Sequence, residues 1–314
     1  MHGMRMAPPS AELIAGGGVF FGVRGSSTQG FAAMPKLLYL LCALVLLAAP
    51  VRADACTLWA AAGPQVAGGG TIIVKNRDWR PDNQQKIRLA TKGKYRFIYL
   101  EAEGNSFSGA KQGINEKGLA IVLASAPREV ERAGKNAGMT KLRILLASYA
   151  SVQEALAALK AGAWVTNPQF MVLADAKEIA CVEFGPGGQY AVVAQQGSGV
   201  VFHTNHYVSP QLEPLNPHKL STSLDRYNKI SSLLQAGAPF DVQKFQAFST
   251  DPTLWRAGAT PSTTRTLSSW IIRQMPDGSG TLYLRMANPD HPVKEYRFAL
   301  KDLFEGKVDL SLVQ

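Results

Sequence analysis

Cysteine is scarce in this chain, which contains three cysteines among its 314 residues. Cys42 lies in an apolar segment that we expect to be removed, so only Cys56 and Cys181 remain. Two cysteines cannot form the set of disulfides that stabilises many small exported proteins. Cys181 stands in a segment typical of a strand, where we predict an inert, buried thiol. The sequence therefore excludes a disulfide-based scaffold.

Residue patterns that hold metals, nucleotides or nucleic acids are also missing. Histidines, cysteines and carboxylates do not cluster at metal-ligand spacing. Gly68-Gly69-Gly70 precedes a predicted strand, whereas a phosphate-binding loop leads into a helix. The 33 Lys and Arg outnumber the 23 Asp and Glu, but the cations are dispersed rather than gathered in a stripe. We predict no metal, no cofactor and no nucleic-acid partner.

Apolar runs are too short for a membrane-spanning helix, which needs about 20 residues. The longest run, residues 37–50, follows a basic start at Met34 and precedes a small-residue cleavage site, as in a secretory signal peptide. We predict a disordered upstream extension at residues 1–33, a signal peptide at residues 34–55 and one domain at residues 56–314. The mature protein is then periplasmic or secreted, without stable membrane insertion.

Cleavage after Ala55 makes Cys56 the first residue of the mature chain. Its thiol and a free α-amino group then stand on one residue, and an α-amine, with a pKa of about 7.7–8.0, can act as the base for the thiol. The alternative is a lipoprotein, in which Cys56 is acylated and tethered. Ala53 and Asp54 fit that pattern poorly, because a lipoprotein site has a leucine-like residue and a small residue at these places.

The rest of the chain reads as many short strands and a few helices, with no internal repeat. Ser151 and Glu154 have the spacing of a capping box at the start of one helix. Helices set between runs of antiparallel strands indicate an α+β domain whose sheets are covered by helices. Strands are predicted at residues 57–62, 71–76, 96–102, 119–124, 170–174, 178–184, 190–194, 200–204, 270–274, 281–286 and 295–300, and helices at residues 139–150, 151–160, 220–234 and 241–248.

The first two predicted strands place a charged segment beside Cys56. If they form a hairpin that pairs Ala62 with Thr71, Cys56 lies opposite Arg77, give or take about two residues. The segment Lys75-Asn76-Arg77-Asp78-Trp79 then ends beside the thiol. A cation there favours the thiolate, and a carboxylate can hold the α-amino group. The alternative is a strand end that becomes charged where it meets solvent.

Five sequence blocks occur in the order seen in N-terminal-nucleophile hydrolases. The chain resembles the linear-amide C–N hydrolases of that class, such as choloylglycine hydrolase, penicillin V acylase and isopenicillin-N acyltransferase-like enzymes. This resemblance implies a four-layer αββα fold, in which helices flank two antiparallel sheets. The blocks are Cys56-Thr57, Asn76-Arg77-Asp78-Trp79, Gly113-Ile114-Asn115-Glu116-Lys117-Gly118-Leu119, Thr204-Asn205-His206-Tyr207 and Ser223-Leu224-Asp225-Arg226-Tyr227.

The resemblance implies roles for four catalytic residues. Cys56 matches the nucleophile, whose α-amine takes the thiol proton and returns it to the leaving amine. Asp78 matches the aspartate that binds that amine. Asn205 matches the asparagine that donates to the oxyanion, a contribution of about 10²–10³ in rate. Arg226 matches an arginine that holds the surroundings of the nucleophile together.

Two positions depart from the pattern of that group. Its other arginine falls on Lys75, unless Arg77 takes that role, and lysine lacks the bidentate fork of arginine. A second oxyanion asparagine falls on Ser125, which can offer a backbone N–H but not the same side-chain donor. Lys75, Arg77 and Ser125 are therefore candidate supporting or oxyanion residues. The serine argues against close bile-salt specificity.

These observations predict an exported cysteine amidase that cleaves a small N-acyl amide through a thioester on Cys56. An acyltransferase with an amine acceptor, a non-catalytic exported binding protein and a lipoprotein remain alternatives. His203 and His206 flank Asn205, and we expect them to pack or meet solvent rather than pair with Cys56. The oligomeric state is left open.

Overall fold

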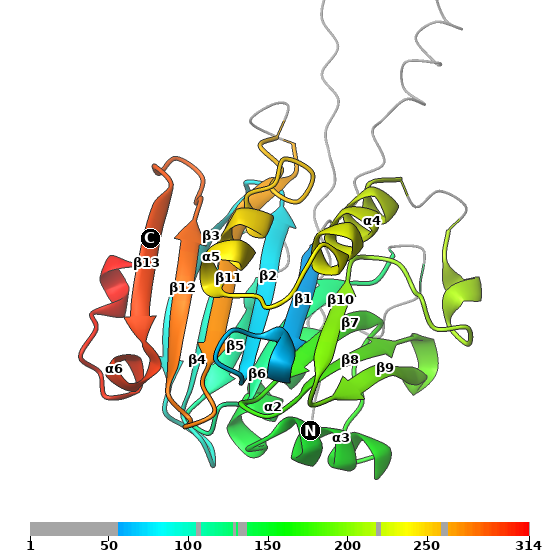
Figure 1. Ribbon diagram of the computed structural model, residues 1–314, viewed down its shortest axis with the longest axis horizontal. Helices are drawn as coiled ribbons and strands as arrows, with labels where there is room; N and C mark the ends of the chain where they lie inside the picture. Colours follow the sequence, from blue (N-terminus) through cyan, green and yellow to red (C-terminus); the bar gives the residue numbers. More distant parts are fainter. Residues whose placement is uncertain are drawn as a thin grey trace, which may run out of the picture. The chain divides into compact units, whose positions relative to one another are not determined.

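The computed structural model describes residues 56–104, 108–127, 130, 137–217, 221–258 and 263–313. The predicted upstream extension and signal peptide lie outside these residues. The described chain contains two antiparallel sheets (Figure 1). The six-stranded sheet has the order β10(Gly199–His203), β1(Thr57–Ala62), β2(Thr71–Trp79), β11(Arg265–Gln274), β12(Gly280–Met286), β13(Lys294–Ala299). The seven-stranded sheet runs in chain order through β3(Asn83–Ala90), β4(Phe97–Gly104), β5(Gly109–Asn115), β6(Ala120–Ser125), β7(Gln169–Ala174), β8(Ile179–Phe184) and β9(Tyr190–Gln196).

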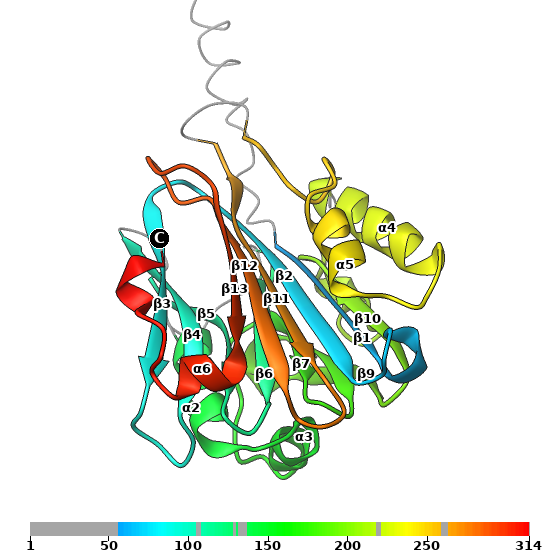
Figure 2. The same ribbon diagram turned by 60° about the vertical axis from the view of Figure 1, so that its left-hand side comes forward.

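Helices cover the outer face of each sheet, which gives four layers. Apolar residues of α4(Ser221–Gln235) and α5(Val242–Ser249) pack on β1 and β2, and Figure 2 shows both helices beside that sheet. Residues of α2(Ala137–Ser148) and α3(Val152–Lys160) pack on the seven-stranded sheet. A third apolar cluster fills the space between the sheets. The α+β fold with two helix-flanked antiparallel sheets is confirmed.

Alternation along β1 explains why this strand lies in the middle of the sandwich. All six of its residues are buried. Leu58 and Ala60 enter the core between the sheets, whereas Trp59 and Ala61 pack under the helices. A strand with apolar side chains on both faces requires a layer on each side.

The predicted helix starts and strands are largely observed. Ser151 caps α3 by accepting a hydrogen bond from the Glu154 N–H at 3.1 Å, as the capping box predicts. The Glu154 carboxylate accepts from the Ala150 N–H at 2.8 Å. All eleven predicted strands are present, with shifts of a few residues at their ends.

Among the described residues, two strands and one α-helix were not predicted from the sequence: β3, β5 and α6(Leu300–Phe304). β3 has the sequence Asn-Gln-Gln-Lys-Ile-Arg-Leu-Ala and lies at the edge of its sheet, where polar side chains mask the β pattern. β5 contains Gly109 and Gly113, which favour a turn over a strand. A Cβ at Gly113 would meet the Ile98 carbonyl oxygen at 2.6 Å, so the close approach of the neighbouring strand β4 explains why this residue is glycine.

Candidate active site

The register of the first hairpin is the predicted one. Ala62 pairs with Thr71 and Thr57 with Asn76, so Cys56 stands opposite Arg77, immediately before the start of β1. Cys56 is 7% exposed and packs with the core between the sheets. Its Sγ lies 4.0 Å from the Asp78 carbonyl oxygen. The thiol therefore faces the space between the sheets, beside the charged end of β2.

Asn205 is bonded directly to the main chain of Cys56. It follows β10, whose pairing with β1 matches His203 to Leu58 and so brings Asn205 level with Cys56. Asn205 Oδ1 accepts from the Cys56 N–H at 2.9 Å, and Nδ2 donates to the Ser125 carbonyl at 2.8 Å. The side-chain amide of Asn205 thus has a fixed orientation. Ser125 takes part through its carbonyl group in this structure.

Arg226 joins the same group of residues from helix α4. Its Nη2 donates to Asn205 Oδ1 at 3.0 Å, and its Nη1 donates to Thr57 Oγ1 at 3.1 Å. Nη1 also donates to the Cys56 carbonyl oxygen. The guanidinium is 2% exposed, so these bonds form away from water. Arg226 therefore fixes the carbonyl of Cys56 and the acceptor oxygen of Asn205 together.

Asp78 approaches from the outer face of β2, the face opposite Arg77. Its Oδ1 accepts from Thr266 Oγ1 at 2.6 Å. Its Oδ2 is buried and has no hydrogen-bond partner among the described residues. Burial raises the pKa of Asp78 to about 6, although Arg226, the Thr266 hydrogen bond, Arg256 and Arg77 act in the other direction. A buried carboxylate with an unused acceptor oxygen is suited to binding an ammonium group.

Lys75 lies on the inner face of β2, the face that also carries Cys56. It is 2% exposed, and its Nζ donates to the Lys111 carbonyl at 3.1 Å. Burial lowers the pKa of Lys75 to about 8; the charges of Cys56 and Asp78 act to raise it, and that of Arg77 lowers it further. The ammonium and the thiol thus share the inner face of the sheet, on neighbouring strands.

Arg77 shares this inner face but points toward other partners. Its Nη2 donates to Asn83 Oδ1 at 3.2 Å, and its guanidinium lies 5.7 Å from the ring centre of Trp79. Both candidate cations are therefore buried next to the start of β1. The hydrogen bond to Lys111 fixes Lys75 between the two sheets, where the thiol lies.

Replacing Lys75 tests its influence on the thiol of mature protein. Because its pKa is lowered to about 8, Lys75 carries its charge below that pH and loses it above. We expect Lys75→Met to slow alkylation of Cys56 by iodoacetamide about tenfold near pH 6.5, since an opposite charge favours the thiolate. The difference should vanish well above pH 8, and Lys75→Arg should keep the fast reaction. Equal rates for Lys75→Met and wild type at pH 6.5 would contradict this role.

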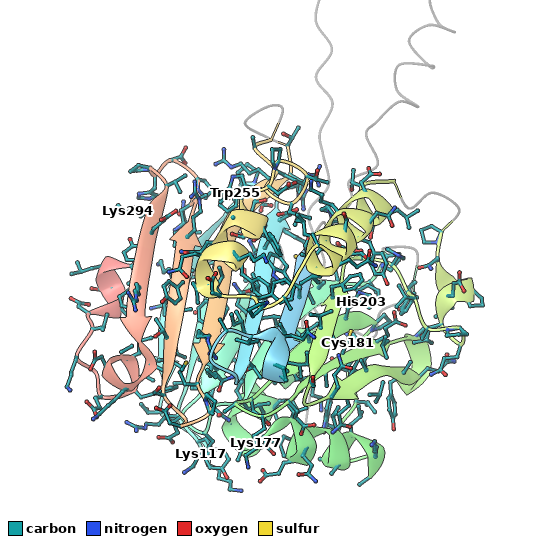
Figure 3. All side chains as sticks on the ribbon, viewed as in Figure 1. Lys117, Lys177, Cys181, His203, Trp255 and Lys294 are labelled. Carbon is teal, nitrogen blue, oxygen red and sulfur yellow. The ribbon has the colours of Figure 1, made fainter. Side chains whose placement is uncertain are left out.

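The other thiol is buried, and the two flanking histidines bond to residues other than Cys56. Cys181 is 1% exposed, and burial raises the pKa of its thiol far above the ordinary range. Figure 3 labels Cys181, on β8 of the seven-stranded sheet, and His203, on β10 of the six-stranded sheet. His203 bonds to Glu183, and His206 bonds to Thr204 and Ser223. These bonds are consistent with packing roles for both histidines.

Three residues of this neighbourhood were not found from the sequence. Thr57 accepts from Arg226, Thr266 donates to Asp78, and Glu183 bonds to the segment that carries Asn205. Thr266 is 188 residues from Asp78 in the chain. Only the pairing of β2 with β11 brings them together. No sequence pattern near either residue indicates such a contact. A role for Thr57, in contrast, could have been inferred from its place beside Cys56 in the sequence.

Two stacked antiparallel sheets between helix layers, with a cysteine at the start of a central strand, define an N-terminal-nucleophile hydrolase. More narrowly, the chain belongs to the acyl-coenzyme A:6-aminopenicillanic acid acyl-transferase family, whose model matches residues 66–290. The family assignment places the chain among enzymes of amide hydrolysis or acyl transfer. Comparison with curated protein sequences finds no match.

Solved structures with this fold include two of conjugated bile acid hydrolase from Clostridium perfringens. An arginine-to-leucine variant is 14% identical over 81% of this chain and 94% of that chain, with a TM-score of 0.52. A cysteine-to-alanine mutant is 13% identical with the same coverage and a TM-score of 0.53. Penicillin V acylase from Agrobacterium tumefaciens is 15% identical over 82% of this chain and 89% of that chain, with a TM-score of 0.48. At these identities, the two hydrolase structures support the fold assignment.

Within the described ranges, no group of three or more His, Cys, Asp or Glu residues is placed to hold a metal ion. In the same part of the chain, no single helix has the length and apolarity needed to cross a bilayer. The segments Lys141–Ser148 and Val152–Lys160, bent at 118°, pass that test only as a pair.

Proposed function

We propose that this chain is an exported cysteine amidase that cleaves a linear amide of a small N-acyl substrate. The observation that carries the proposal is a set of hydrogen bonds that joins the Cys56 main chain, Asn205 and Arg226. The Asp78 carbonyl oxygen lies beside the Cys56 thiol. The residues matched by the family model include Asp78, Asn205 and Arg226, and they begin after Cys56. The proposal adds export, a cysteine nucleophile and linear-amide specificity to the family assignment.

Removal of the leader is the activating step in this proposal. In the full chain the Cys56 nitrogen is a peptide N–H that donates to Asn205. Cleavage before Cys56 would turn it into an amine with further N–H donors and a basic lone pair. Asp78 Oδ2, which has no partner among the described residues, is the acceptor we assign to that amine. The amine can then take the proton of the thiol on the same residue.

The proposed reaction proceeds in two acyl-transfer steps. The Cys56 thiolate attacks the amide carbonyl, and Asn205 Nδ2, which bears a second N–H besides the one given to Ser125, stabilises the oxyanion. The tetrahedral intermediate collapses to a thioester as the α-ammonium returns its proton to the leaving amine. Water, activated by the same amine, then attacks the thioester and releases the acid and the thiol.

Acyl transfer to an amine is the second candidate, because the family model that matches is named for an acyl-transferase. The two reactions share the thioester and differ in the group that attacks it. Adding primary amines to a turnover reaction distinguishes them. An acyltransferase would form new amides in preference to free acid, whereas an amidase would release acid at every amine concentration tested.

The decisive experiment measures the intact mass and N-terminal sequence of protein purified from the periplasm, before and after iodoacetamide at pH 7. We expect a chain that begins at Cys56 and gains one carbamidomethyl group rapidly. That product would then be assayed against a panel of N-acyl amides. A lipid-sized mass increment, a chain that begins upstream of Cys56, or an unreactive thiol would overturn the proposal and favour the lipoprotein or the binding protein.

A further inference from the structure

A buried, hydrogen-bonded pair of side chains, His203 and Glu183, connects the two sheets next to Asn205. His203 ends β10 in the six-stranded sheet, and Glu183 lies on β8 in the seven-stranded sheet. Their side chains are fully buried, with His203 Nε2 2.8 Å from Glu183 Oε1. His203 Nδ1 lies 3.1 Å from the Thr204 carbonyl oxygen. Both ring nitrogens of His203 thus lie within hydrogen-bond distance of an oxygen atom.

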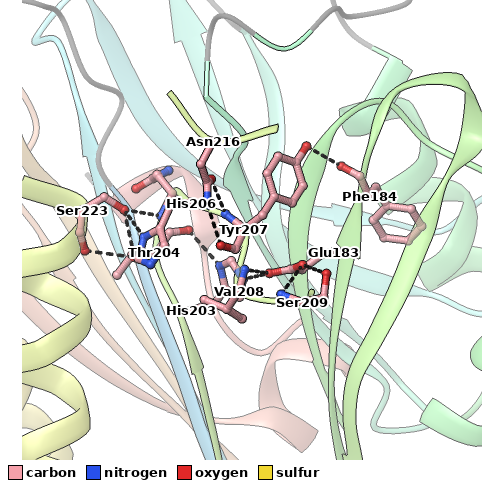
Figure 4. A network of polar contacts seen from close by, with 11 residues as sticks. Glu183, Phe184, His203, Thr204, His206, Tyr207, Val208, Ser209, Asn216 and Ser223 are labelled. Carbon is pink, nitrogen blue, oxygen red and sulfur yellow. Dashed lines mark hydrogen bonds and ion pairs between the residues drawn. The ribbon is translucent and has the colours of Figure 1, made fainter. Parts of the chain in front are cut away.

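The same carboxylate accepts hydrogen bonds from the far side of the Asn205 segment. Glu183 Oε1 accepts from the Val208 N–H at 2.6 Å, and Oε2 accepts from the Ser209 N–H at 3.1 Å. Ser209 Oγ also donates to Oε2. Figure 4 shows these bonds converging on Glu183. One carboxylate therefore holds both ends of residues 203–209, and Asn205 lies between those ends.

Glu183 is ionised in this environment at neutral pH. Burial raises its pKa, but the hydrogen bond and charge of His203, together with the bonds from Ser209 and Val208, outweigh burial and hold the pKa below its ordinary value. Phe170 stacks on the His203 ring at 4.1 Å between centroids and excludes water from that side. The pair is therefore a desolvated histidine and carboxylate joined by a hydrogen bond.

A second set of bonds fixes the middle of the segment to helix α4. The Asn205 N–H donates to Ser223 Oγ at 2.9 Å, and Ser223 Oγ lies 2.9 Å from His206 Nδ1. Burial, together with the charge of His203, lowers the pKa of His206 to about 4, so this ring is neutral and can accept the Ser223 proton. Helix α4 also carries Arg226, so both anchors act on Asn205 and its neighbours.

We propose that Glu183 and His203 are positioning residues that hold the Asn205 side chain in line with the oxyanion formed on the substrate. This inference rests on the proposed function. A buried ion pair is weak evidence for stability, because an apolar pair of similar volume is often as stable. Here, however, four hydrogen bonds from one segment converge on one carboxylate, and an apolar residue cannot fix that backbone path. The geometry points to conformational specificity of the oxyanion segment.

Glu183→Gln is the main test, because it keeps the size of the side chain and removes its charge. We expect kcat for a substrate of the wild type to fall roughly 10–100-fold, as for residues that orient an active group, with KM unchanged. The rate of Cys56 alkylation should not change, because alkylation needs no oxyanion donor. In an Asn205→Ala background, Glu183→Gln should have no further effect on kcat, since both act through one group.

Asp175→Asn provides a matched control in the same hairpin of β7 and β8. Asp175 is also a buried carboxylate that accepts backbone N–H groups, from Val152 at 2.9 Å and Lys177 at 2.8 Å. It lies at the turn, away from Glu183. This variant should lower thermal stability while leaving kcat unchanged. Its effect on stability should add to that of Asn205→Ala.

Amide hydrogen exchange tests the positioning role independently of turnover. Glu183→Gln should speed amide exchange in residues 204–209 and leave the turn at Asp175 unchanged. Should Glu183→Gln fail to fold, Ser209→Ala removes one donor and should give smaller changes of the same kind. An inactive wild type would contradict the proposed function, while exchange would still decide the positioning role. Unchanged exchange at residues 204–209, or a full kcat in Glu183→Gln, would overturn the inference.

Discussion

Cys56→Ala is expected to abolish turnover of N-acyl amides while the fold is retained. Loss of a covalent nucleophile typically lowers kcat by roughly 10⁴–10⁶-fold. The other thiol of the described residues cannot replace it, because Cys181 is 1% exposed and burial keeps it protonated. Cys56 contributes one sulfur atom to the core between the sheets, so the free energy of unfolding should fall by only about 1 kcal/mol.

The measurement combines steady-state kinetics with thermal unfolding followed by circular dichroism. Cys181→Ala is the matched control, since it removes the other thiol of the described chain and should leave kcat near the wild-type value. Normal turnover in Cys56→Ala would refute a cysteine nucleophile at this position. Loss of turnover together with loss of the folded baseline would require repeating the test with Cys56→Ser, which preserves the shape of the side chain.

The position of the nucleophile relative to β2 was predictable from sequence because it depends on a local hairpin. Residues 63–70 form a short connection rich in glycine, and apolar side chains on both flanking strands fix the register. Gly70 has a φ of 73°, and a Cβ there would meet the Gln274 carbonyl oxygen at 2.2 Å. Such a connection leaves few alternative pairings. Once Ala62 pairs with Thr71, the place of Cys56 beside Lys75, Arg77 and Asp78 follows.

Strands β3 and β5 could not be recognised in the same way. In β3 only alternate residues such as Gln85 and Ile87 are buried, and a buried glutamine does not mark a strand interior. The backbone of Gln85 is hydrogen-bonded to the side chain of Asn288. Asn288 Nδ2 donates to the Gln85 carbonyl oxygen at 3.0 Å, and the Gln85 N–H donates to Asn288 Oδ1 at 2.6 Å. That contact spans 203 residues of sequence. Edge strands stabilised by such distant side chains carry little local signal.

Contacts between the two sheets were the part of the site that sequence could not provide. The resemblance supplied Asp78, Asn205 and Arg226, but not the residues that orient them. Glu183 reads as a lone charge in an apolar strand, and nothing near it in the sequence indicates a bond to His203 across the sandwich. Packing of one sheet on the other determines that bond. Positioning residues of this kind emerge only from tertiary structure.

Asn205→Ala is expected to lower kcat by about 10³-fold, at the upper end of the range of about 10²–10³ for the loss of an oxyanion donor alone. Its Nδ2 is the donor we assign to the oxyanion, but its Oδ1 also accepts from the Cys56 nitrogen and from Arg226. Truncation therefore removes the donor and also frees the nucleophile's own main chain. Kinetics of the mature variant, with intact mass to verify processing at Cys56, provide the measurement.

Asn205→Asp separates these two effects, because aspartate keeps acceptor oxygens for Cys56 and Arg226 but has no N–H for an oxyanion. If the donor dominates, Asn205→Asp should be as inactive as Asn205→Ala while Cys56 remains as reactive toward iodoacetamide as in wild type. If holding the main chain dominates, Asn205→Asp should recover most of the activity. Asn115→Ala is the control, since Asn115 bonds to the Leu146 and Tyr149 carbonyls at 2.8 and 2.7 Å, outside the site. It should lower stability and spare kcat, and near-normal kcat in both Asn205 variants would remove this residue from the mechanism.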